Sequence, residues 1–186
     1  LLTEGIPPDQ VALSDILERA GVARATLYHH FGDLEGLVGA AIINLYARNV
    51  RGDIEAISAM IAAASTPEEL SSQLQQVTLA SQSEQRRNAR SLRAGFICYA
   101  RTREAIADKL AVCQAELTRE MSAAIADGQA RRLFRADIDP WGMAVFVQAY
   151  TLGKVIDDIA AEKMIPGVWE QLIKLLVTDR VINHDA

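Results

Sequence analysis

The chain has 186 residues, half of them hydrophobic, and a formal net charge of −5. This length allows one domain, or a small domain joined to a larger one. The acidic balance excludes a protein that coats nucleic acid through an excess of positive charge. Modest numbers of Gly (11) and Pro (5) favour an all-α fold with a substantial core.

The cysteines and the apolar runs indicate in which cellular compartment the protein is expected. Cys98 and Cys113 form no CxxC pair, which favours a reduced protein without a disulfide framework. The longest apolar run, residues 143–156, is interrupted by Gln148 and Lys154 and is too short to cross a bilayer. We therefore expect a cytoplasmic protein with no membrane partner.

The first ten residues predict an irregular start. Residues 1–5 resemble the last turn of a helix, so we expect a first helix that is missing from this sequence. Residues 5–10 predict a turn, because Pro7 and Pro8 are unsuited to a helix interior. Asp9 is expected to cap the helix that follows.

Two short helices are predicted next, over 11–20 and 24–30. In the first, Leu13, Ile16, Leu17 and Ala20 recur on one helical face. Gly21 supplies the left-handed backbone that ends a helix. Two short helices joined by such a turn form a helix-turn-helix, whose second helix enters the DNA major groove.

The same residues resemble a known family. The pattern Ile16-x-x-x-Ala20-Gly21-Val22-x-x-x-Thr26-Leu27-Tyr28-x-His30-Phe31, followed by Glu35-x-Leu37, is similar to the DNA-binding head of TetR/AcrR-type regulators. The resemblance implies an all-α protein with two parts. The helix-turn-helix head would span 1–47, and a helical body that binds a ligand and dimerises would span 48–186.

The resemblance also implies roles for the second helix. Arg24 suits guanine edges, with Ala25 and His29 near other bases, and Thr26 and Tyr28 would hold phosphates. For His30, packing against the helix that joins head and body is favoured over contact with DNA. A small head core is expected from Leu13, Ile16, Val22, Leu27 and Phe31.

A second interpretation stays open for the head. Residues 1–50 carry three Arg and six acidic residues, a net charge of −3, whereas phosphate neutralisation supplies much of DNA affinity. Leu34 occupies a position where the family usually has a phosphate-contacting Lys, and Val11, Ala12 and Ala23 lack the usual hydroxyls. The alternative is a helical dimeric ligand-binding protein that no longer binds DNA.

Six longer segments after residue 32 have helical periodicity, and several have helix-start signals. Asp33, Thr66-Pro67 and Asp139-Pro140 each mark a helix start, Gly128 is expected to end a helix, and Gly52 allows a bend. The predicted helices span 33–63, 67–81, 84–101, 103–128, 140–161 and 167–181.

Charged residues in the body are interpreted as solvated helix faces rather than as sites. This applies to the arginines at 86, 87, 90, 93 and 103, and to the acidic pairs 116/120 and 157/158. His184 is assigned to a terminal tail. The sequence has no P-loop, GxGxxG, HExxH or GxSxG, so we expect no enzyme, no catalytic residue, no cofactor and no metal site.

The last two predicted helices are apolar on more than one face. A helix that is apolar all round is buried all round, which in this chain predicts a partner subunit. The resemblance implies the same, a two-fold four-helix bundle built from two copies. The expected homodimer interface comprises Val145, Ala149, Leu152, Gly153, Ile156, Val168, Leu172, Leu175 and Leu176.

Larger side chains of the body are candidates for a pocket, although ordinary core packing is the favoured explanation for each of them. They are Phe96, Tyr99, Met121, Phe146, Gln148 and Tyr150. Few have polar tips, so the small-molecule effector would be mostly hydrophobic. The expected function is a transcriptional repressor on double-stranded operator DNA, released when the ligand changes the separation of the two recognition helices.

Overall fold

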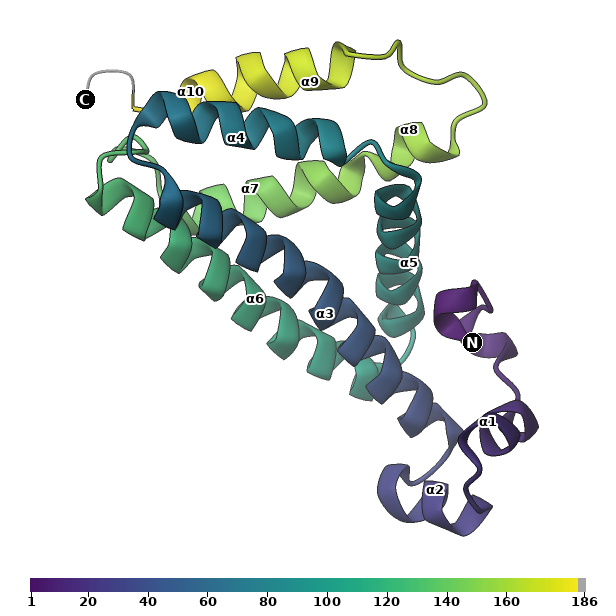
Figure 1. Ribbon diagram of the computed structural model, residues 1–186. Helices are drawn as coiled ribbons and strands as arrows, with labels where there is room; N and C mark the ends of the chain where they lie inside the picture. The colour runs from purple at the N-terminus through teal and green to yellow at the C-terminus, as the bar shows by residue number, and fades with distance from the viewer. Residues whose placement is uncertain (184–186) are drawn as a thin grey trace.

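The computed structural model describes residues 1–183, whose regular structure is helical. Figure 1 shows two short helices at one end of a long helix, with the remaining helices beside it and near its other end. The expected all-α fold is confirmed. His184, assigned above to a tail, lies outside the described residues.

The head begins with two short 3-10 turns, Leu2–Glu4 and Pro8–Gln10, followed by α1 (Leu13–Ala20) and α2 (Arg24–Phe31). The first helix therefore starts two residues later than expected. Asp9 does not cap it, because Asp9 belongs to the second 3-10 turn and α1 has no side-chain cap. Gly21 ends α1 with a φ of 63°, as the sequence predicted.

The long helix α3 (Leu34–Ala63) joins the head to the body as 30 residues without a break at Gly52. The carboxylate of Asp33 accepts a hydrogen bond from the Gly36 amide at 2.7 Å, which confirms the predicted cap. The division expected at 47/48 falls inside this helix and stays a prediction.

Three further helices follow as predicted: α4 (Pro67–Ala80), α5 (Glu84–Arg101) and α6 (Glu104–Ala130). Thr66 caps α4 by accepting a hydrogen bond from the Glu69 amide at 3.2 Å. Helices α3 and α6 run side by side along the body (Figure 1). They approach closely where Gly39 faces Ile106, since a Cβ at position 39 would lie 2.9 Å from the Ile106 side chain.

Gly128 does not end α6, contrary to the expectation from sequence. The helix continues to Ala130, and the chain turns at Arg132, which has a φ of 60°. Gly128 instead makes room for Phe134, since a Cβ at position 128 would lie 2.6 Å from the Phe134 ring. The glycine serves close packing here rather than a turn.

The C-terminal part is more segmented than predicted. The expected helix 140–161 is α7 (Pro140–Gly153) and α8 (Val155–Ile159), interrupted at Lys154. The expected helix 167–181 is α9 (Val168–Ile173), a π-helical stretch (Lys174–Thr178) and α10 (Asp179–Val181). None of the described helices combines the length and the apolar character needed to cross a membrane.

Two arginines expected on a solvated face are buried. Arg90 and Arg93 are each 6% exposed, because both lie on the side of α5 that also carries Phe96 and Ala100. The Asp158 side chain, also expected at the surface, is 5% exposed.

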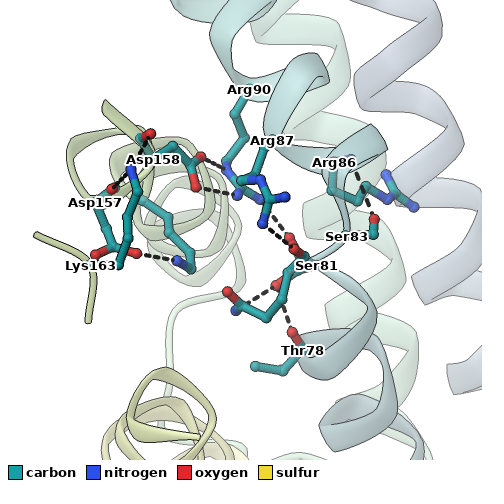
Figure 2. Close-up of polar contacts among 11 residues, drawn as sticks. Thr78, Ser81, Ser83, Arg86, Arg87, Arg90, Asp157, Asp158 and Lys163 are labelled. Atoms are coloured by element: carbon teal, nitrogen blue, oxygen red, sulfur yellow. Dashed lines mark hydrogen bonds and ion pairs between the residues drawn. The ribbon is translucent and has the colours of Figure 1, made fainter. Parts of the chain in front are cut away.

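Figure 2 shows how the charges of Arg90 and Asp158 are satisfied. Arg90 binds Asp158 through two nitrogens, at 2.7 and 2.9 Å, and donates to the Ser81 carbonyl at 2.7 Å. Lys163 donates to the carbonyls of Asp157 and Asp158 (Figure 2). These bonds connect α5, the end of α4 and the segment after α7.

Candidate functional site

Helix α2 holds the residues expected to read DNA. Leu27, 4% exposed, anchors one side of the helix in the protein. Arg24, Ala25, Tyr28 and His29 recur at spacings that place them together on the opposite side. All four are exposed, as is Thr26 at the edge of that side.

The head core is smaller than expected. Val22 and Phe31 are 40% and 42% exposed, so both were wrongly assigned to it. Leu13 and Ile16 are half-buried. His30 is exposed, and its ring contacts only neighbours on α2 among the described aromatic groups, with centroids 5.1 Å from His29 and 6.4 Å from Phe31.

Several acidic side chains of the head are engaged away from the exposed side of α2. Glu4 binds Arg19 at 2.8 Å, and this bond holds the pKa of the Glu4 carboxyl below its usual value. Asp33 caps α3, and Glu35 lies 3.4 Å from Arg103, the residue that precedes α6. The net charge of the head therefore understates how well α2 can approach a phosphate backbone.

A cavity of about 110 Å³, which we call the central cavity, lies in the body between α3, α4, α6, α7 and the C-terminal helices. Its walls are mostly aliphatic and aromatic, and polar groups such as Thr78, Ser81 and Gln129 interrupt them. Ile57 of α3 contributes to the lining, so the helix that carries the head also forms a wall of the cavity.

Met121 and Tyr150 are the two predicted pocket residues that line this cavity. The Tyr150 ring packs near Phe146 and Trp169, with centroids 5.6 and 6.3 Å away. Its hydroxyl makes no hydrogen bond with the described residues, and burial raises the pKa of Tyr150 to about 12. The phenol is therefore an available polar group in a mostly apolar cavity.

The other predicted pocket residues lie elsewhere. Phe96 is a core residue at 2% exposure. The guanidinium carbon of Arg103 lies 3.6 Å from the centroid of the Tyr99 ring. Phe146 is 50% exposed on the outer side of α7. Gln148 accepts a hydrogen bond from Gln114 at 2.8 Å in a polar cluster beneath α7. Sequence reasoning missed Ile57, Trp169 and Phe134 as lining residues.

Many apolar side chains are exposed along α7, α8 and the C-terminal helices. Of the predicted interface residues, Leu152 and Val168 are half-buried and the rest are exposed, including Ile156 (73%) and Leu176 (69%). We call this the apolar face. It also includes residues that the sequence analysis did not assign to it: Trp141, Phe146, Ile159 and Ile165.

Comparison with known proteins identifies the head. Residues 7–41 match the family model of bacterial regulatory proteins of the tetR family. These residues cover α1, α2 and the start of α3, and so contain the helix-turn-helix described above. No curated protein matches the chain significantly. Residues 7–41 are thus a TetR-family N-terminal DNA-binding domain, which indicates a DNA-binding transcriptional regulator.

Proposed function

We propose that this regulator is a homodimeric repressor that binds operator DNA through α2 and leaves it when a small, mostly hydrophobic ligand fills the body cavity. One observation carries the proposal. The exposed side of α2 is attached to one end of α3, and the other half of the same unbroken helix lines the cavity. A ligand and DNA therefore act on opposite ends of one rigid element.

On DNA, five exposed residues of α2 read bases or hold phosphates. Arg24, at the first position of the helix, can present its two-pronged guanidinium to guanine. Ala25 and His29 lie on the same side, close to neighbouring bases. Thr26 and Tyr28 hold phosphates and so fix the register of the helix in the groove. We propose that the protein acts in the cytoplasm, where operator DNA is found.

The apolar face is the surface for a second copy. Monomeric proteins rarely expose so large an apolar surface, and two-fold pairing of α7 and the C-terminal helices would cover it. Such a dimer must hold its recognition helices about 34–36 Å apart to meet successive major grooves. A ligand that favours another separation would lower DNA affinity through its differential binding to the two arrangements.

A gel-shift experiment tests DNA binding. The probe is the promoter DNA next to the protein's own gene, with random-sequence competitor, at low and moderate salt. We expect Arg24→Ala to weaken specific binding about 5- to 150-fold, because one bidentate base contact is worth about 1–3 kcal/mol. Tyr28→Ala should weaken binding to specific and random DNA alike, because a phosphate contact carries no sequence information.

Arg48→Ala is the matched control, since Arg48 is an exposed arginine on α3 outside the head. It should bind as the wild type does. If the wild-type protein retards no DNA at any salt concentration while remaining folded by circular dichroism, the repressor proposal fails. The ligand-binding protein without DNA activity is then the better description.

A further inference from the structure

Arg93 lines a second pocket, which shares no lining residue with the central cavity. This pocket has a volume of about 470 Å³ and lies between α5, α6 and α7, with Tyr46 of α3 also in its lining. Four alanines, at positions 100, 107, 111 and 149, line it. Their short side chains leave the space that larger residues would fill.

The Arg93 guanidinium is a buried cation without a counter-ion. The residue is 6% exposed, and its Nε atom is buried with no hydrogen-bond partner. Among the described residues it forms no ion pair, and its guanidinium carbon lies 5.7 Å from the centroid of the Tyr46 ring. Arg90, one turn earlier, is fully paired with Asp158 by contrast.

Neighbouring polar groups do not satisfy Arg93, because they bind one another. The Tyr46 hydroxyl donates to Gln114, and the Gln114 amide donates to Thr118 and Gln148 at 2.9 and 2.8 Å. The described lining contains a second arginine, Arg101, and no acidic residue. The pocket lining is thus positively charged at Arg93 and Arg101 and apolar at most other positions.

From this arrangement we infer that the pocket binds a small organic carboxylate whose hydrocarbon part packs against the apolar walls. A carboxylate can accept two parallel hydrogen bonds from a guanidinium, which matches the planar fork of Arg93. Burying a cation without a partner is costly, so an anion that pairs with it gains unusually much. Inorganic phosphate would leave Ile97, Leu110 and Leu152 without a contact.

The pocket opens beside Ala149 and Leu152, which belong to the apolar face, so a carboxylate from a second copy is the competing occupant. Two acids of α8, next to this face, are already engaged and so are not available to fill the pocket of a second copy. Asp158 is paired with Arg90, and Asp157 accepts from Lys154 at 2.8 Å. This inference does not depend on DNA binding and goes beyond the proposed function.

The test compares carboxylates with their uncharged amides on the full chain. Hexanoate, octanoate and benzoate, each beside its amide, are titrated into wild type, Arg93→Met and Arg48→Met, and binding is followed by calorimetry and by the shift in Tm. We expect at least one carboxylate to bind wild type and Arg48→Met saturably. Its affinity should fall about tenfold or more in Arg93→Met, as for the loss of a charge-assisted bond.

A further variant separates pocket binding from a general effect of charge. Ala111→Phe fills the pocket from its exposed rim and leaves Arg93 in place, and it should also abolish carboxylate binding. Arg93→Met without ligand should be as stable as wild type or more so, because the unpaired cation is gone. If that variant does not fold, Ala111→Phe decides the question alone.

Four results would overturn the inference. The first is that none of the carboxylates binds, and the second is that each amide binds as well as its acid. The third is that Arg93→Met dissociates a dimer in sedimentation while wild type binds no carboxylate, which would assign the pocket to a second copy. Binding that persists unchanged in Arg93→Met would likewise place the ligand in the central cavity.

Discussion

Arg90 and Asp158, 68 residues apart in sequence, form a two-point ion pair in which both side chains are at least nine-tenths buried. Because Arg90 also binds the Ser81 carbonyl and Ser81 lines the central cavity, the pair connects the cavity wall with α8 on the apolar face. The body therefore depends on a charge pair in a region where sequence alone suggested a solvated surface.

Removing one partner of this pair should be strongly destabilising. Asp158→Asn leaves Arg90 buried with part of its charge unmatched, and we expect a loss of about 3–5 kcal/mol in the free energy of unfolding. The double variant Arg90→Met/Asp158→Leu should recover much of that loss. Chemical denaturation measures both. Glu120→Gln, which breaks the exposed Arg51–Glu120 pair, is the control and should change stability little.

Two glycines of long helices should respond oppositely to alanine. Gly128→Ala forces a Cβ to within 2.6 Å of the Phe134 ring, and overpacking of this kind costs about 1–3 kcal/mol. Gly52→Ala meets nothing within 4 Å and should stabilise the protein by up to about 1 kcal/mol. Thermal unfolding of the two variants side by side checks the contrast. Equal shifts would show that Phe134 can move aside.

Stability should fall in alkaline solution because of Tyr150. The folded protein has a Tyr150 pKa of about 12, above the ordinary 10, so it holds the phenolic proton more tightly than the unfolded chain does. The contribution is complete below pH 10 and disappears as the pH rises through 12, a loss of at most about 2–3 kcal/mol. The difference in unfolding free energy between wild type and Tyr150→Phe should shrink or reverse over this interval. A constant difference would indicate a solvated phenol.

A charge on the apolar face should separate the proposed dimer. Leu176 is 69% exposed there, and Leu176→Asp should yield a folded monomer with reduced DNA affinity, as measured by sedimentation and gel shift. Leu79, 63% exposed on α4, offers the control. Leu79→Asp should leave assembly unchanged. A wild-type chain that sediments as a monomer at every concentration would refute the dimer.

Helix positions were predictable wherever local chemistry decides them. Asp33, Thr66 and Asp139 accept hydrogen bonds from backbone amides at helix starts, and each had been assigned from its place before an apolar repeat. The head was predictable because identities and spacing coincide over a short stretch. These features depend on residues within one or two turns of each other.

The features that the sequence did not predict depend on residues that are far apart in the chain. Burial of Arg90 requires Asp158, and a single sequence does not show that α5 faces α8. One signal was available: Arg93, Phe96 and Ala100 share one helical stripe, so Arg93 belonged with core residues. Phe146 and Tyr150, one helical turn apart, both looked like pocket residues, but only Tyr150 lines the cavity and Phe146 is half exposed.

The uninterrupted course of α3 has a mechanical consequence. At 1.5 Å per residue its 30 residues span about 45 Å, so a tilt of about 5° at the cavity end moves the far end by about 4 Å. Two such levers swinging apart in a symmetric pair would alter the gap between their tips by about 8 Å, a quarter of the distance between successive grooves. A tilt too small to disturb the packing around a ligand is thus large enough to displace the recognition helices from successive major grooves.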